Sequence, residues 1–361
     1  MNIVLDNLVF ALQKSGGISV VWYELLSRLM KTDNKLFLMN YKNNNLFTKK
    51  LCFNDSNVIW DKNINFLTLK RYLNPRINIQ EPFIFHSSYY RTCSNPYAIN
   101  ITTVHDFTYE YFASGIKKWI HLWQKYRAIR KSDYIICISE NTKKDLLKFL
   151  PDVDENKIRV IYNGVSDDYY KKNETFKLNI PFEPMKYVLF VGARSKHKNF
   201  ELSVKAVADT NLNLVMVGPP LSEEEIHFLN KIMKNTNRYY CTGRIDNCEL
   251  NNLYNCAYAL LYPSKYEGFG IPVIEAQKAG CPVIAYNGSS VAEIIGETPL
   301  LLQKLTTNEV VKSLQILSDT TVRESVIVRG LYNSRRFSWD NMYEQTIKLY
   351  NEAWLNKVVC F

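Results

Sequence analysis

The sequence predicts an α/β protein made of two doubly wound domains, and three observations lead to this prediction. Short runs rich in β-branched and aromatic residues alternate with helical patterns along the chain, as in parallel sheets whose strands are joined by helices. A polar segment with two prolines, residues 166–186, interrupts this alternation once, and the alternation then starts again. The length of 361 residues suits two domains better than one.

In the first half, apolar runs that end in polar residues predict the strands. Residues 16–30 place Val21, Leu25 and Leu29 on one helical face. Ser139 is the expected N-cap of a helix over residues 140–150, because its hydroxyl can accept a first-turn N–H. The strands expected here are residues 2–7, 83–88, 99–107, 132–139 and 158–165.

The second half repeats this arrangement after the polar segment, which we interpret as an interdomain linker. The strands expected here are residues 186–193, 212–220, 239–243, 258–264 and 281–287, and the helices are residues 199–210, 222–235 and 246–257 and a helix that begins at about Ile271. An amphipathic pattern over residues 337–358 predicts a last helix, which fits either domain.

The net charge of +10 is concentrated in the first half, where residues 1–165 carry 23 Lys and Arg against 14 Asp and Glu. A basic domain attracts nucleic acid, anionic lipid or an acidic substrate. We expect no nucleic-acid partner, because the sequence contains no helix-turn-helix, zinc-finger or RNP-type aromatic signature. An anionic membrane surface and an anionic substrate remain as candidates.

The cysteines and the apolar runs indicate the compartment. None of the eight cysteines forms a CxxC pair, and Cys137, Cys256 and Cys281 lie in apolar runs, which is typical of free buried thiols in a reducing cytosol. The sequence starts without a basic segment and cleavage site, and it has no apolar run of membrane-spanning length. We therefore expect a cytoplasmic protein, with peripheral contact to the inner face of the cytoplasmic membrane as an open alternative.

That alternative depends on residues 115–131, where apolar and aromatic residues recur at helical spacing among lysines and arginines. One interpretation is a helix that lies in the interface of an anionic membrane. The other is an ordinary helix with its apolar side in the core and its basic side in water. The sequence leaves both open.

Ligands of open α/β sheets bind beyond the carboxyl ends of the strands, so the residues that follow each strand are the candidate site. Gly16 and Gly17 open a helix after the first strand, although a loop hinge explains them equally well and no GxGxxG fingerprint of a nicotinamide oxidoreductase is present. His105 ends a strand and is either a sugar or phosphate ligand or a structural residue. Asp152 and Asp154 form a DxD string after Pro151, which we interpret as a turn.

Two further segments carry charges suited to a nucleotide diphosphate. Arg194, Lys196 and Lys198 crowd one strand-to-helix loop, where they would clamp a diphosphate or form a solvated surface loop. The segment KYEGFGIPVIEAQKAG, residues 265–280, places Glu267 before a glycine-bracketed turn and Glu275 among apolar neighbours. A helix that begins at such a turn directs its N–H groups at an anion, and a carboxylate can accept both hydroxyls of a ribose.

With these motifs the chain resembles the group 1 retaining glycosyltransferases, glycosyltransferase family 4. The segment from Glu267 to Glu275 is similar to the family's E-x7-E signature, and residues 132–146, 158–165, 242–257, 260–296 and 336–342 resemble further family segments. The resemblance covers nearly the whole chain and is weakest over residues 35–100. It implies the GT-B fold, with two Rossmann-like domains facing across a cleft. The acceptor domain would comprise residues 1–165 with a crossover helix over 340–361, and the donor domain residues 166–339.

The resemblance also implies roles for individual residues. Glu267, His105, Arg194 and Lys198 would be catalytic, with Glu267 and His105 on the transferred sugar and the two cations on the diphosphate. Ala193 stands where many members have that arginine. The residues expected to bind the nucleotide sugar are Gly16, Gly17, Gly243, Arg244, Ile245, Gly268, Phe269, Gly270, Ile271 and Glu275.

The implied activity is retaining transfer of a hexose, such as mannose, from a GDP- or UDP-sugar without a metal ion or other cofactor. The acceptor would be a glycan or a lipid-linked glycan of a bacterial O-antigen or capsule. Two alternatives stay open: a GT-B enzyme that acts on soluble sugars, and a non-catalytic subunit that binds nucleotide sugars.

Overall fold

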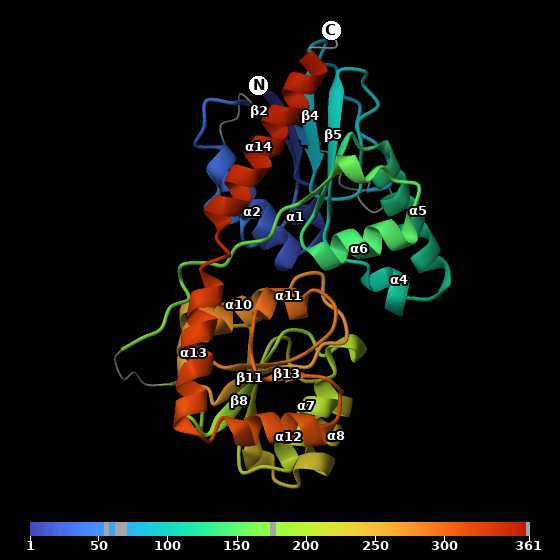
Figure 1. Ribbon diagram of the computed structural model, residues 1–361. Coiled ribbons are helices and arrows are strands. Elements are labelled where there is room, and N and C mark those ends of the chain that lie inside the picture. The colour runs from blue at the N-terminus through green and yellow to red at the C-terminus, as the bar shows by residue number, and fades with distance from the viewer. Residues whose placement is uncertain (54–57, 62–70, 174–177, 359–361) are drawn as a thin grey trace. The chain divides into compact units, whose positions relative to one another are not determined.

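The computed structural model describes residues 1–53, 58–61, 71–173 and 178–358 (Figure 1). The predicted linker's residues 174–177, the last three residues of the predicted crossover helix and Cys360 lie outside the described residues. The chain divides into two compact units, of which the first comprises residues 1–164 and 339–361 and the second comprises residues 165–338. Each unit is an α/β structure with its own parallel sheet.

The first unit contains a seven-stranded sheet in the order β3-β2-β1-β4-β5-β6-β7. All the strand pairs are parallel, and β1 and β4 are buried along their whole length, as strands covered on both faces are. The strands are β1 (Asn2–Asp6), β2 (Lys35–Tyr41), β3 (Val58–Asp61), β4 (Phe83–Ser87), β5 (Ala98–Val104), β6 (Tyr134–Cys137) and β7 (Ile158–Val160).

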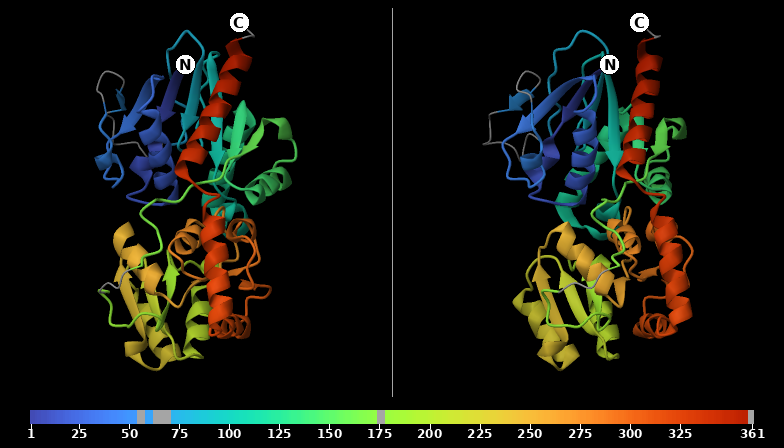
Figure 2. Two further views of the ribbon diagram at one scale, coloured as in Figure 1. Left: turned by 60° about the vertical axis from the view of Figure 1, so that its left-hand side comes forward. Right: turned by 90° about the vertical axis from the view of Figure 1, so that its left-hand side faces the viewer.

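The helices of this unit include the last helix of the chain. They are α1 (Leu8–Leu12), α2 (Gly17–Leu29), α4 (Thr108–Phe112), α5 (Gly115–Lys131), α6 (Glu140–Phe149) and α14 (Trp339–Val358). Helix α14 packs beside α2, β4 and β5 (Figure 2), and the hydroxyl of Tyr350 hydrogen-bonds Nδ1 of His86 at 2.5 Å. The predicted cap of α6 is confirmed, because Ser139 Oγ accepts the N–H of Thr142 at 3.0 Å.

The second unit contains a six-stranded parallel sheet in the order β10-β9-β8-β11-β12-β13. Its strands are β8 (Tyr187–Val191), β9 (Asn213–Val217), β10 (Tyr239–Gly243), β11 (Ala259–Tyr262), β12 (Val283–Tyr286) and β13 (Leu301–Leu302). In both units the strand order reverses beside the first strand, so both sheets are doubly wound as predicted. The reversal in the second unit lies between β8 and β11, and it marks the place where such sheets bind ligands.

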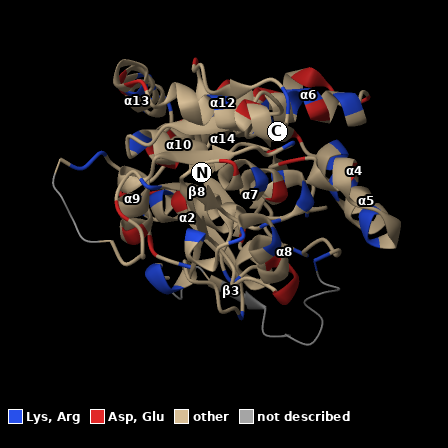
Figure 3. Ribbon diagram, turned by 90° about the horizontal axis from the view of Figure 1, so that it is seen from below, with Lys and Arg blue, Asp and Glu red and all other residues tan. Residues whose placement is uncertain are grey.

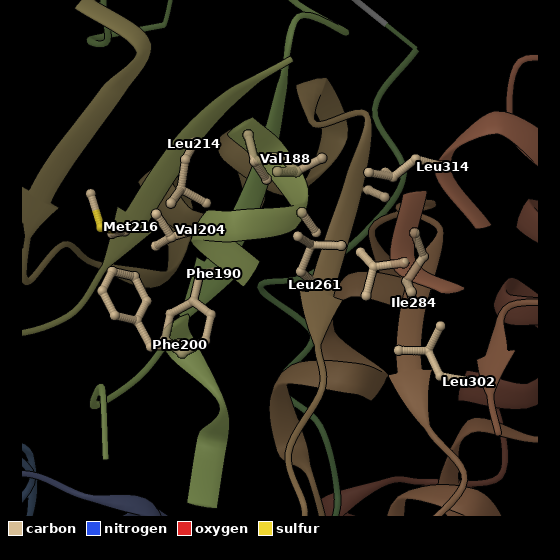
Figure 4. Packing of buried hydrophobic residues seen from close by; sticks show 14 of the residues in the cluster. Val188, Phe190, Phe200, Val204, Leu214, Met216, Leu261, Ile284, Leu302 and Leu314 are labelled. Carbon is tan, nitrogen blue, oxygen red and sulfur yellow. The ribbon is translucent and has the colours of Figure 1, made fainter. Parts of the chain in front are cut away.

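Helices pack on this sheet through one apolar core, part of which Figure 4 shows. Phe190 of β8 meets Phe200 edge to face, with ring centroids 5.2 Å apart. The helices are α7 (Phe200–Ala208), α8 (Glu223–Met233), α9 (Asn247–Cys256), α10 (Ile271–Lys278), α11 (Val291–Ile295), α12 (Thr307–Ile316) and α13 (Thr320–Ser334). The sequence predicts the first four of these but neither the last three nor the two-residue strand β13, whose patterns are short or weakly periodic.

Part of the predicted linker is ordered against the second unit. The backbone N–H of Tyr170 donates to Asn251 Oδ1 at 3.1 Å, and that of Lys172 donates to Asn255 Oδ1 at 2.7 Å. Both acceptors lie on α9. The residues of this stretch that dock on α9 therefore belong to the second unit, and the boundary between the units lies at residues 164 and 165.

Three smaller predictions can also be compared with the structure. Asp152 and Asp154 lie in a turn, where Asp152 pairs with Arg130 at 2.7 Å and Asp154 caps a short 3₁₀ helix. Cys137 and Cys281 are buried, whereas Cys256 is only partly so. Among the described residues, no helix is both long enough and apolar enough to cross a membrane.

Candidate active site

The turn before α10 lies at the carboxyl end of β11, beside the reversal of strand order. Gly270 adopts φ +106°, a left-handed conformation that suits glycine. The helix then begins with Pro272 in its first turn, and no side chain caps its N-terminus. Pro272 has no N–H and that of Val273 donates to the Gly270 carbonyl at 2.9 Å, so the N–H of Ile271 is the first-turn donor that can meet an anion.

Two serines that follow β12 hold this turn in place. Ser290 is buried, and its hydroxyl donates to the carbonyl oxygens of Glu267, at 2.8 Å, and Phe269, at 3.0 Å. The backbone N–H of Glu267 donates to Ser289 Oγ at 2.9 Å. The sequence analysis missed both serines, although their place after a strand and Gly288 was a usable signal.

Lys198 and Glu267 form an ion pair at this turn, with 2.9 Å between Nζ and Oε1. Both side chains are largely buried, being 19% and 15% exposed. Lys198 comes from the loop after β8, and two hydrogen bonds join this loop to the loop after β11. The N–H of Lys265 donates to the His197 carbonyl at 2.7 Å, and Nδ2 of Asn199 donates to the Pro263 carbonyl at 2.8 Å. The structure therefore brings together two residues that are 69 positions apart.

Close packing of backbone places the Lys198 ammonium at the end of β8. Gly192 has φ +116°, and a side chain there would start 3.7 Å from Nζ of Lys198. At Gly218, which follows β9, an added Cβ would lie 2.6 Å from the carbonyl oxygen of Gly192. Gly192 therefore requires glycine for its backbone angle and Gly218 for its close approach to the Gly192 carbonyl, whereas 3.7 Å to the ammonium is an ordinary contact.

Glu275 lies in the second turn of α10, where two tyrosines hydrogen-bond its carboxyl group. The hydroxyl of Tyr254 donates to Glu275 Oε2 at 3.1 Å. Burial raises the pKa of Glu275 to about 7, although hydrogen bonds from Tyr254 and Tyr169 oppose this rise. At neutral pH the carboxyl group is therefore near its titration midpoint, and a ligand that donates hydrogen bonds would favour the ionised form.

Tyr262, the last residue of β11, connects the two carboxylates. Burial raises its pKa well above the usual value, and the charges of Glu267 and of Glu275 add to this rise. Nζ of Lys198 lies 5.4 Å from the centroid of the same ring. Lys198, Glu267 and Glu275 therefore surround one buried tyrosine, which the sequence analysis did not select.

Two of the three predicted base-side residues, Arg244 and Ile245, line a separate cavity of the second unit, and Gly243 precedes them. Gly243 has φ +73° and ends β10, and the cavity has a volume of about 340 Å³. Residues 178–180 line the same cavity, although the sequence predicts them to be linker. Tyr169 connects this region with Glu275, because its hydroxyl hydrogen-bonds the carboxyl group and lies 3.1 Å from Asn247 Oδ1.

Arg194 is used differently from Lys198. Its Nε donates to Glu225 Oε1 at 2.7 Å, and its Nη2 donates to the carbonyls of Pro219 and Pro220 at 2.9 and 2.7 Å. The side chain is only 4% exposed, and its buried Nη1 has no hydrogen-bond partner. The guanidinium thus connects the loop after β9 with the start of α8. Nη1 is the guanidinium nitrogen that could still make the predicted contact with a diphosphate.

The remaining predicted residues belong to the first unit. Gly16 is the N-cap of α2, and Gly17 is its first residue. His105 follows β5, and burial lowers its pKa to about 4, so the imidazole is neutral at pH 7. Ile18 of α2 and His105 line the same small cavity, so this unit brings the start of α2 close to the end of β5.

Among the described residues, no group of three His, Cys, Asp or Glu side chains is arranged to hold a metal ion. The charged side chains that surround Tyr262 are one lysine and two carboxylates, and the N-terminus of α10 follows the same strand. This set can bind an anion through the cation and the N–H of Ile271, and it can accept hydroxyl donors at the carboxylates.

The two doubly wound units define a protein with the GT-B fold. Residues 171–320 match the family model described as glycosyl transferases group 1, and residues 15–169 match that of glycosyltransferase family 4. The chain belongs to this family of glycosyltransferases.

The relatives whose names describe an activity include two O-antigen chain mannosyltransferases. The chain is 38% identical over 109 residues, 30% of its length and 29% of the relative's, to O-antigen chain mannosyltransferase B of Escherichia coli. It is 29% identical to O-antigen chain mannosyltransferase RfbU of Salmonella typhimurium over 66% of each chain. The alignments thus span less than two thirds of either relative.

Solved structures support the fold. The sucrose-phosphate synthase of Thermosynechococcus elongatus matches 99% of this chain and 100% of its own, with a TM-score of 0.76 and 19% identity. Alr3699/HepE of Anabaena, solved with UDP and glucose, matches 98% and 100%, with a TM-score of 0.70 and 15% identity. At such identities the likeness shows the GT-B fold alone.

Proposed function

We propose that the chain is a retaining hexosyltransferase of bacterial O-antigen or capsule synthesis. It transfers a hexose, with mannose as the first candidate, from a GDP- or UDP-sugar to a glycan or a lipid-linked glycan. Membership of the family and the two O-antigen mannosyltransferase relatives support the activity and the kind of product, and the UDP in the HepE structure supports a nucleotide donor. The observation that carries the proposal is the Lys198–Glu267 pair beside the uncapped start of α10.

The chemistry of the reaction explains why these groups matter. The anomeric C–O bond breaks through an oxocarbenium-like state, and the departing nucleoside diphosphate gains negative charge as it breaks. A cation and an N–H group that are already in place stabilise this charge more in the transition state than in the ground state. Lys198 and the first turn of α10 supply that stabilisation, so the proposal requires no metal ion.

The other residues position the substrates. Glu267 orients the ammonium of Lys198 and accepts hydroxyls of the sugar, and Glu275 accepts the hydroxyls of the ribose. The neutral imidazole of His105 donates to the transferred sugar from the acceptor domain, while Arg244 and Ile245 contact the base. Arg194 acts mainly by holding the loop after β9.

Substitution of Lys198 tests this function. Lys198→Ala should lower turnover of the preferred donor by about 10²- to 10³-fold, because one preorganised charge is lost from the leaving-group site. Turnover is measured as release of GDP or UDP from a panel of nucleotide sugars in the presence of a membrane extract that holds the acceptor. Lys205→Ala is the matched control, since Lys205 forms an exposed pair with Glu201 at 3.7 Å on α7.

Equal activity of the Lys198→Ala and Lys205→Ala variants would contradict the proposal. A donor that raises the melting temperature but is never consumed, with any acceptor, would identify a non-catalytic binding subunit. Transfer to a free sugar instead of a membrane-bound acceptor would favour the alternative of a GT-B enzyme with soluble substrates.

A further inference from the structure

Helix α5 exposes an apolar face. Ile116, Trp119, Ile120 and Trp123 follow helical spacing, so they lie on one side of the helix. Their exposed fractions are 74%, 70%, 41% and 55%. The sequence interpretation of α5 as a helix with its apolar side in the core is therefore wrong for these four residues.

The buried face of α5 is mixed, since Leu122, Ala128 and Ile129 are buried there together with Gln124 and Lys125. Nζ of Lys125 lies 2.8 Å from Glu110 Oε1, and both side chains are 1% exposed. The same ammonium donates to the Asp106 carbonyl at 2.6 Å and lies 3.5 Å from the centroid of the Phe107 ring. A helix surrounded only by water and its own protein would place the tryptophans inside and the lysine outside.

Helix α4 extends the exposed apolar surface. Tyr109 and Phe112 are 43% and 46% exposed, and the ring of Tyr109 stacks on His121 of α5 with centroids 4.0 Å apart. We define the aromatic patch as Tyr109, Phe112, Ile116, Trp119, Ile120 and Trp123. A continuous exposed patch of six apolar and aromatic side chains marks an interaction surface.

The charge around the aromatic patch is mainly positive. Residues 108–131 contain six Lys and Arg and one acidic residue, Glu110. Lys125 forms a buried pair with Glu110, and Arg130 pairs with Asp152, which leaves Lys117, Lys118, Arg127 and Lys131. Helix α5 itself has no acidic residue, and its basic positions are visible in Figure 3. The guanidinium of Arg127 lies 5.3 Å from the centroid of the Trp123 ring, so a cation borders the patch directly.

We propose that the aromatic patch docks on an anionic lipid surface. The tryptophans and isoleucines enter the boundary between headgroups and acyl chains, while the surrounding Lys and Arg contact lipid phosphates. A second copy of the chain fits less well, because two such patches would bring like charges together. The inference rests on the proposed function, because docking would hold the enzyme where a lipid-linked acceptor lies. Binding to the lipid surface can nevertheless be measured without turnover.

Vesicle binding by the full chain tests this surface. Vesicles of phosphatidylethanolamine with 30% phosphatidylglycerol are sedimented with wild-type protein, and pure phosphatidylcholine vesicles serve as the comparison. We expect binding to the anionic vesicles and a loss of about tenfold or more in Trp119→Ser/Trp123→Ser. The matched control is Val328→Ser/Tyr332→Ser on α13, where residues that are 64% and 73% exposed are replaced outside the patch.

Several outcomes would overturn the proposal: no binding of wild type to anionic vesicles, equal binding by the Trp119→Ser/Trp123→Ser variant, or a dimer that this variant dissociates. Circular dichroism and the donor-induced shift in melting temperature show that the variant is folded. Vesicle binding without nucleotide-sugar turnover would support the docking surface and refute the proposed function. Turnover without vesicle binding would support the proposed function and refute the docking surface.

Discussion

At the scale of single residues, the second unit uses its two similar cations in different ways. Lys198 is held against one carboxylate and one ring at the start of α10, whereas Arg194 meets two backbone carbonyls and Glu225. The difference follows from geometry, because the planar guanidinium can reach several acceptors at once and the ammonium behaves as a point charge. The positive charge of both residues in the sequence therefore did not show which one lies at the start of α10 and which one supports the loop after β9.

Glu275 gives a prediction that depends on pH. Its folded-state pKa of about 7 lies above the ordinary value of 4.5, so its ionisation costs stability as pH rises between these values. Glu275→Gln should therefore raise the melting temperature of the ligand-free protein at pH 8 and change it much less at pH 5. The same variant should weaken binding of the donor nucleotide at pH 8, because the amide is a poorer acceptor for two hydroxyls.

Thermal unfolding at both pH values checks this prediction, and nucleotide titration at pH 8 gives the second readout. Lower stability of Glu275→Gln at pH 8 would show that the carboxylate is well solvated or strongly paired in the folded state. Unchanged nucleotide affinity would remove Glu275 from the donor site.

At the scale of elements, the buried pair of Lys125 and Glu110 holds α5 to α4. Burial lowers the pKa of Lys125 and raises that of Glu110, while their mutual attraction opposes both shifts. Lys125→Met alone leaves Glu110 buried without its partner and should cost about 3–5 kcal/mol of unfolding free energy. Lys125→Met combined with Glu110→Gln should recover much of this loss, since no unpaired charge remains.

Urea unfolding of the two single variants and the double variant measures this coupling. Arg130→Met is a suitable control, because its pair with Asp152 is about half exposed and should contribute at most about 1 kcal/mol. A double variant as unstable as the sum of the single variants would show that the two residues act independently.

Helix α5 also shows where prediction from sequence reaches its limit. Periodicity correctly predicts a helix over residues 115–131 and shows that its apolar residues lie together. It does not show which side faces the sheet, because that depends on residues far away, such as Gln124 donating to the carbonyl of Tyr90 at 3.1 Å. Burial of Lys125 depends on Glu110 in the same way.

The candidate site has the same limit. Strand ends, glycines and charges were visible in the sequence, so Lys198, Glu267 and Glu275 could be selected before the structure was known. Their supports, Ser290 and Tyr254, come from other elements. The place of Ser290 after a strand and Gly288 was a usable signal, whereas Tyr254 lies within α9 and had none in a single sequence. The roles of all these residues in catalysis stay predictions until the variants are measured.

At the scale of the whole molecule, the first unit is built from both ends of the chain. Trp339, Met342, Leu349 and Tyr350 of α14 are buried in it. The second unit, in contrast, is continuous from residue 165 to residue 338 and has its own sheet and apolar core. The two units should therefore respond differently to loss of the last helix.

Truncation after Ser338 tests this difference. Removing α14 exposes the apolar surface that it covers on α2, β4 and β5, and it deletes at least three buried apolar side chains, each worth about 1.5–3 kcal/mol. This loss is comparable with the whole stability of an ordinary domain, so the first unit should unfold. A fragment of residues 165–338 should remain folded, show one cooperative thermal transition and keep a nucleotide-dependent shift in melting temperature. Circular dichroism and calorimetry follow both, and a folded first unit in the truncated chain would mean that α14 is dispensable to its core.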